Sequence, residues 1–75
     1  MFAKLVAITG PDTGKVIEVV PSVSLIVGRS READARLRDP RVSPFHCRIE
    51  VRDRMIMVTD MDSTIGTAVN NVFVL

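Results

Sequence analysis

Three places where a strand is predicted to end carry side chains that could bind a phosphate. The first is Gly28-Arg29, the second surrounds Ser43, and the third surrounds Thr64. A guanidinium and two hydroxyl groups are donors well suited to phosphate oxygens. If the strands lie side by side, the three loops meet at one rim together with backbone N–H groups. The sequence therefore predicts an anion-binding site at that rim.

A catalytic interpretation of the same residues is disfavoured. His46 lies three residues after Ser43, and Asp60 or Asp62 could complete a Ser-His-Asp hydrolase. The sequence around Ser43 has no nucleophile elbow and no oxyanion site, however. A lone histidine and a lone cysteine, Cys47, also make no metal site. We expect no catalytic residue, no metal and no cofactor.

Composition indicates one small domain spanning residues 1–75. A chain of this length buries only about 60% of its unfolded surface. The residues are 47% hydrophobic and include neither Trp nor Tyr, so the core is predicted to be aliphatic, with large rings only at Phe2, Phe45 and Phe73. The single cysteine, Cys47, excludes an intramolecular disulfide, fits a reducing cytoplasm and is predicted to be a buried strand residue.

Charge is unevenly distributed although the net charge is only +1. Residues 29–54 hold eight arginines against five acidic residues, which biases this region toward anions. Nucleic-acid binding is an alternative, but interleaved acids and the lack of Tyr or Trp for base stacking count against it. The chain has no membrane-length apolar run and no export signal, so we expect a cytoplasmic protein without a membrane partner.

The elements that would position these residues are short strands. Residues 2–9 and 15–20 predict a hairpin around a five-residue turn, and residues 23–27 predict a third strand that ends at Gly28. Residues 30–41 predict a loop with a short strand. No helix is predicted, and strands at intervals of about 8 to 12 residues indicate an all-β sandwich or barrel.

The second half of the chain also alternates as strands do. Residues 46–52 predict a half-buried strand with Cys47, Ile49 and Val51 facing inward and with His46 on the outer face together with the charged residues. Turns are predicted at 53–54 and 70–71. The returning strand, 55–60, is predicted to place Ile56 and Val58 on the inner face. Residues 67–75 are predicted to form one or two short strands, broken at Asn70-Asn71.

The order and spacing of the motifs closely resemble the forkhead-associated (FHA) domain, from about residue 5 to residue 75. The motifs that carry the resemblance are Gly28-Arg29, Val-Ser43-x-x-His46 and Asp60-x-x-Ser63-x-x-Gly66-Thr67-x-x-Asn70. The resemblance implies a β-sandwich of mostly antiparallel short strands, lacking about three C-terminal strands of that family. It also implies a non-enzymatic module that binds phosphothreonine-containing proteins or peptides through loops at one end.

The resemblance also implies roles for individual residues. Arg29 matches the pocket arginine, Ser43 matches a serine whose hydroxyl and backbone N–H meet the phosphate, and Thr64 matches a second hydroxyl position. Four further positions match the scaffold of the binding loops, namely Gly28, His46, Gly66 and Asn70.

Two positions depart from the family pattern. Ile65 stands where an asparagine usually fixes the ligand backbone, and Pro44 stands where a polar donor is common. Neither side chain can donate a hydrogen bond. If each lost bond costs about 1 kcal/mol, the affinity for a phosphopeptide falls roughly ten- to a hundredfold.

These departures and the shorter sheet leave a second function open. The alternative is a degenerate FHA scaffold that mediates phosphate-independent interaction or self-association. An uncovered sheet edge could pair with another chain, either as a homodimer or by strand completion.

Overall fold

The computed structural model describes residues 3–75, so the predicted ring of Phe2 and the first residue of the predicted strand 2–9 lie outside the described residues. The described part contains eight strands and no helix. They are β1 (Ala3–Val6), β2 (Val16–Val19), β3 (Leu25–Gly28), β4 (Ala35–Arg36), β5 (Cys47–Arg52), β6 (Met55–Asp60), β7 (Ala68–Val69) and β8 (Val72–Phe73). The predicted all-β class is confirmed.

The predicted first hairpin is present as the β1–β2 ribbon, in which Leu5 pairs with Ile17 in antiparallel register. Its turn is closed by the Gly14 N–H, which donates to the Ala7 carbonyl at 2.8 Å. Gly14 has a φ of 94°, a conformation that glycine reaches more easily than other residues.

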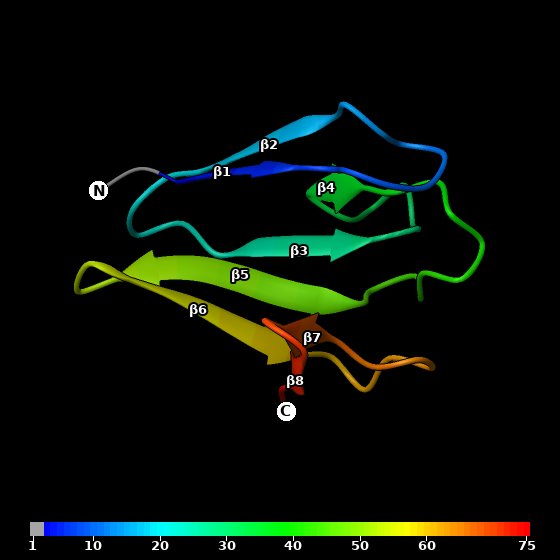
Figure 1. Ribbon diagram of the computed structural model, residues 1–75. Coiled ribbons are helices and arrows are strands. Elements are labelled where there is room, and N and C mark those ends of the chain that lie inside the picture. The colour runs from blue at the N-terminus through cyan, green and yellow to red at the C-terminus, as the bar shows by residue number, and fades with distance from the viewer. Residues whose placement is uncertain (1–2) are drawn as a thin grey trace.

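The main sheet has the strand order β4-β3-β5-β6. The β3–β5 and β5–β6 pairs are antiparallel, whereas the short β4 runs parallel to β3. The β1–β2 ribbon packs against part of one face of this sheet, and the β7–β8 hairpin lies beside the end of β6 (Figure 1).

The core lies between the β1–β2 ribbon and the main sheet and is aliphatic, as predicted. Its buried residues are Val19, Val27, Ala35, Cys47, Ile49 and Val51. The alternation predicted for β5 is confirmed, since Cys47, Ile49 and Val51 are buried while Arg48 and Arg52 are exposed. Cys47 is thus a packing residue of the core, and its burial raises the pKa of its thiol.

Two predicted side-chain positions differ from the structure. His46 was expected on the outer face, but its side chain is buried, with 8% of its surface exposed. The strand begins one residue later, at Cys47, so the strand alternation does not govern His46. Ile56 pairs with the buried Val51 and thus lies on the predicted face, yet it is 48% exposed because β6 is an edge strand of the sheet.

Both predicted tight turns are present. Asp53 and Arg54 have φ values of 52° and 63° between β5 and β6. Asn70 and Asn71 have φ values of 51° and 68° between β7 and β8. Two consecutive positive values match the hairpin turn type that fits the strand twist.

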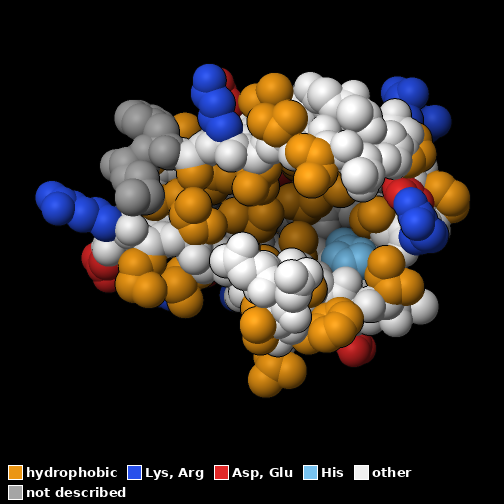
Figure 2. Space-filling model, in the orientation of Figure 1, with side chains coloured by type: hydrophobic (Ala, Val, Ile, Leu, Met, Phe, Trp, Pro, Cys, Tyr) orange, Lys and Arg blue, Asp and Glu red, His pale blue; other side chains and the backbone are white. Residues whose placement is uncertain are grey.

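An apolar face remains uncovered among the described residues. Figure 2 shows hydrophobic side chains gathered in a hollow between the β1–β2 ribbon and the strands below it. Several large hydrophobic residues outside the core are also exposed, among them Ile8, Met55, Val72 and Phe73. Residues 3–75 include no helix that is long and apolar enough to cross a membrane.

Candidate functional site

Three loops meet at one end of the main sheet. Figure 1 shows that β3 ends, β5 begins and β6 ends on the same side of the molecule. The Arg29 N–H donates to the Ser43 carbonyl at 3.0 Å, and the Thr64 N–H donates to the Ser43 hydroxyl oxygen at 2.9 Å. Residues far apart in the sequence are therefore joined directly, in the arrangement that the sequence predicted.

Gly28 lets the second loop approach the end of β3. A Cβ atom at this position would lie 2.1 Å from the Pro44 carbonyl oxygen and 3.0 Å from the Phe45 Cα atom. These are backbone atoms, which cannot move aside as a flexible side chain does. The absence of a side chain at Gly28 thus sets the distance between the first two loops.

Arg29 has an exposed side chain whose direction is fixed by one hydrogen bond. Its Nε–H donates to the Val42 carbonyl at 2.9 Å. The two terminal amino groups of the guanidinium accordingly remain available, and among residues 3–75 no carboxylate forms an ion pair with Arg29. A positioned and uncompensated guanidinium can bind an anion through two parallel hydrogen bonds.

Ser43 and Thr64 bring their hydroxyl groups together beside Arg29. Their oxygen atoms lie 3.4 Å apart, a long hydrogen bond. In this bond the Ser43 hydroxyl donates to the Thr64 hydroxyl oxygen, while the Ser43 oxygen accepts the Thr64 N–H. Because the bond is long and a hydroxyl proton can rotate, the Ser43 proton can be redirected to a ligand. The Ile65 N–H also has no acceptor among the described residues, which adds a backbone donor close by.

The Ser43 N–H occupies a different position from the one that the family resemblance implied. It donates to Nδ1 of His46 at 3.0 Å and is therefore already used within the protein. The Ser43 hydroxyl, and not its N–H, is the group that this loop offers to an anion.

His46 links the second loop to the third. Its Nδ1 atom accepts the Ser43 N–H, and its Nε2 atom lies 2.8 Å from the Gly66 carbonyl oxygen. A ring nitrogen that accepts carries no proton, so the proton of the neutral ring is on Nε2 and is donated to Gly66. Neither ring nitrogen contacts the Ser43 hydroxyl, so the serine–histidine geometry of a hydrolase is not formed.

Asp60 organises the third loop, a role that the sequence analysis did not assign. Its carboxylate accepts the Ser63 hydroxyl at 2.5 Å, the Thr67 hydroxyl at 2.7 Å and the Ser63 N–H at 3.2 Å. The bond from the Ser63 hydroxyl first, and that from Thr67 second, hold the pKa of the Asp60 carboxyl below its ordinary value. The Asp-x-x-Ser spacing could have indicated this turn, because an aspartate commonly accepts hydrogen bonds from nearby residues of its own loop.

Arg41 is a second guanidinium at the site and was also missed. It is paired with Asp39 at 2.7 Å and has 73% of its side-chain surface exposed. The side-chain hydrogen bond from Arg41 lowers the pKa of Asp39 to about 2. The Asp-Pro-Arg turn holds the two charges together, so Arg41 is compensated while Arg29 is not.

The loops enclose a hollow of ≈ 210 Å³, here called the anion pocket. Its lining combines cationic, hydroxyl and apolar residues, namely Arg29, Pro40, Arg41, Val42, Ser43, Pro44, Thr64 and Ile65. The three residues expected to bind phosphate are thus brought together, and the two departures from the family pattern line the same pocket.

The remaining scaffold residues have separate positions. Gly66 has a φ of 88°, and a Cβ atom there would lie 2.9 Å from the Phe73 ring. Asn70 lies in the β7–β8 turn and makes no described side-chain hydrogen bond to the three loops. Asn70 therefore shapes the hairpin and does not touch the anion pocket.

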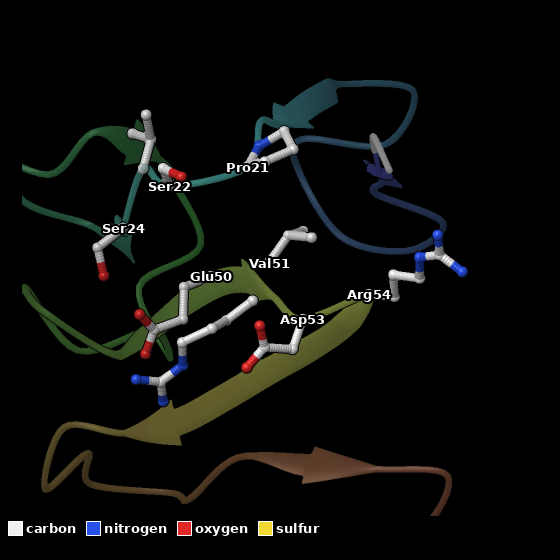
Figure 3. A pocket seen from close by; sticks show the side chains of 9 residues that line it. Pro21, Ser22, Ser24, Glu50, Val51, Asp53 and Arg54 are labelled. Atoms are coloured by element: carbon white, nitrogen blue, oxygen red, sulfur yellow. The ribbon is translucent and has the colours of Figure 1, made fainter.

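A larger hollow of ≈ 330 Å³ lies at the opposite end of the main sheet, beside the β5–β6 turn. We call it the far pocket; its lining residues are Pro21, Ser22, Val23, Ser24, Glu50, Val51, Arg52, Asp53 and Arg54. Figure 3 shows the carboxylates of Glu50 and Asp53 on its lower side and the Arg54 guanidinium pointing away from both. The far pocket thus mixes two acidic residues with two arginines, whereas the lining of the anion pocket holds two arginines and no acidic residue. Among the described residues, no group of three or more His, Cys, Asp or Glu side chains could hold a metal ion.

Comparison with known proteins identifies related sequences. The family model of the FHA domain matches residues 25–75. Over 49 residues the chain is 43% identical to the proliferation marker protein Ki-67 of Mus musculus. The aligned region covers 65% of this chain but only 2% of the length of that relative.

Solved structures show the same similarity. A structure from an analysis of phosphothreonine-dependent FHA domain interactions is 30% identical, with a TM-score of 0.75, over 97% of this chain and 70% of that chain. The FhaA FHA domain complexed with the intracellular domain of Rv3910 is 34% identical, with a TM-score of 0.74, over 85% and 69% of the two chains. The FHA domain of an Arabidopsis thaliana hypothetical protein is 29% identical, with a TM-score of 0.84, over 95% and 61%. With the family model matched from β3 to residue 75, this chain belongs to the FHA domain family.

Proposed function

We propose that this chain is a non-enzymatic module that binds phosphothreonine-containing peptides. The observation that carries the proposal is the uncompensated guanidinium of Arg29, held by the Val42 carbonyl next to the hydroxyl groups of Ser43 and Thr64. A phosphothreonine carries roughly −1.5 to −2 charges and three acceptor oxygens. The similarity of this chain to a structure studied for phosphothreonine-dependent FHA domain interactions supports the same function.

Each pocket residue has a defined part in this proposal. Arg29 supplies charge and two parallel donors, Ser43 donates its hydroxyl proton, and Thr64 supplies a second hydroxyl group. His46 and Asp60 bind within the protein and keep the loops in place before the ligand arrives. A pocket that is ordered before the ligand binds loses less conformational entropy on binding.

The test compares a pool of phosphothreonine peptides with its unphosphorylated counterpart by fluorescence anisotropy. We expect binding only to the phosphorylated pool. An Arg29→Lys variant keeps one positive charge but loses the two parallel N–H donors of the guanidinium. It should bind the phosphorylated pool at least about tenfold more weakly, since a charge-assisted hydrogen bond contributes about 1.5–3 kcal/mol. Equal binding of the two pools by the wild-type domain would refute the proposal.

A second candidate function is a scaffold that associates without phosphate. It is favoured by the exposed apolar residues at the β7–β8 hairpin, where Val72 is 64% and Phe73 is 73% exposed. Sedimentation velocity over a range of concentrations tests it directly. Concentration-dependent self-association that is unaffected by Arg29→Ala would support the scaffold, and a monomer at all concentrations would remove it.

A further inference from the structure

The anion pocket has an apolar wall that no phosphate contact uses. Pro44 and Ile65 line it next to the donors, and Ile65 follows Thr64 directly in the chain. The Ile65 side chain is 59% exposed and does not belong to the hydrophobic core. This wall offers contact surface but no side-chain donor or acceptor.

A ligand that places its phosphate on Arg29 must bring neighbouring residues past this wall. Consecutive residues of an extended peptide advance by at most about 3.3–3.6 Å each, so the residues nearest the phosphothreonine remain within reach of the pocket. A polar side chain against Ile65 and Pro44 would lose hydration without gaining a hydrogen bond. An aliphatic side chain would gain affinity from the area that it removes from water.

The second guanidinium of the pocket does not reverse this preference. Arg41 could attract an acidic ligand residue, but the Asp39 carboxylate already binds it at 2.7 Å through one nitrogen and at 3.1 Å through another. An acidic ligand side chain would also meet the negative charge of Asp39, whose pKa is about 2. The compensated pair thus leaves apolar contact as the main source of selectivity beside the phosphate.

We propose that the domain selects phosphothreonine peptides that carry an aliphatic residue within three positions of the phosphothreonine, and that this residue packs on Ile65 and Pro44. The inference rests on the proposed phosphopeptide function and adds the class of flanking residue. Ile65 is the specificity-determining residue in this account, and Arg29 remains the phosphate ligand.

The test uses synthetic phosphothreonine peptides in an alanine background. Each of the six positions from three before to three after the phosphothreonine is changed in turn to Leu or Asp, and binding is measured by fluorescence anisotropy. One buried methylene group gives about a fourfold gain in affinity. We expect at least one position at which Leu improves binding by about fivefold or more over Ala, and none at which Asp does.

Two variants assign the effect to the apolar wall. Ile65→Asn should reduce the preference for Leu to less than about twofold while phosphate-dependent binding remains. Val23→Asn is the matched control, because Val23 is also exposed, at 44%, but lies in the far pocket. It should keep the full preference. Because both side chains are exposed, neither change is expected to unfold the domain.

The outcomes separate this inference from the function on which it rests. Phosphate-dependent binding with a flat flanking profile, with a preference for Asp, or with a Leu preference that survives Ile65→Asn would overturn the inference alone. Binding that does not depend on phosphorylation at all would overturn both proposals.

Discussion

His46 accepts a hydrogen bond from the Ser43 backbone N–H at 3.0 Å and thereby fixes the residue whose hydroxyl faces the anion pocket. The same ring contacts the Gly66 carbonyl at 2.8 Å, so one buried side chain joins two binding loops. The arrangement of the anion-pocket loops thus depends on hydrogen bonds made within the protein.

Replacing His46 should therefore destabilise the domain as well as its site. His46→Ala leaves the Ser43 N–H and the Gly66 carbonyl without their partner and opens a cavity, at an expected cost of about 2–4 kcal/mol in the free energy of unfolding. Chemical denaturation measures this cost. A matched change at the exposed Ile8, Ile8→Ala, should cost less than about 0.5 kcal/mol. An equally small loss for His46→Ala would show that the ring is not the link between the loops.

Gly28→Ala should be among the most damaging small substitutions in the chain. The added Cβ atom would lie 2.1 Å from the Pro44 carbonyl oxygen, and relieving this overlap requires a backbone shift that costs at least about 3 kcal/mol. Thermal unfolding monitored by circular dichroism measures the effect. Gly14→Ala is the control, because no atom lies within 4 Å of its added Cβ and only backbone strain of about 1–2 kcal/mol applies. Equal losses for the two variants would contradict the close approach.

Acid should loosen the third loop through Asp60. Hydrogen bonds from Ser63 and Thr67 lower the pKa of Asp60 in the folded protein, so the unfolded chain, with an ordinary value of about 3.9, takes up this proton more readily. The resulting stabilisation is complete above about pH 4 and is lost as the pH falls through the folded pKa. Free energies of unfolding measured between pH 7 and pH 2 should show this decline.

Asp60→Asn should make that decline shallower, because the variant carries no titrating carboxylate at this position. The control is Asp62→Asn, since the Asp62 carboxylate makes no hydrogen bond among the described residues. It should keep the wild-type slope. If the two variants show the same pH dependence, Asp60 is not the group responsible.

Strand positions and turns could be predicted well because local physical rules determine them. Side chains alternate on β5, and Asn70-Asn71 can adopt the positive φ values that a tight hairpin needs. The meeting of Arg29, Ser43 and Thr64 at one end followed from where each strand ends. Those predictions needed only the direction of the chain and the periodicity of its side chains.

The predictions that failed depend on tertiary contacts. Strand alternation placed His46 outside, but β5 begins at Cys47, and hydrogen bonds to two loops turn the ring inward. The same bonds consume the Ser43 N–H that the family resemblance assigned to the phosphate. Arg41 was missed because its pairing with Asp39 depends on the conformation of a proline-containing turn. Such contacts become visible only when the loops are placed together.

The central claim is that Arg29 binds a phosphate between the three loops. The most direct measurement is an NMR titration of the wild-type and Arg29→Ala domains, both labelled with ¹⁵N, with a phosphothreonine peptide pool and its unphosphorylated control. We predict phosphate-dependent shifts of the Arg29, Ser43 and Thr64 amides in the wild type, and none in a folded Arg29→Ala domain. Phosphate-dependent shifts that persist in Arg29→Ala, or their absence from the folded wild-type domain, would contradict the account.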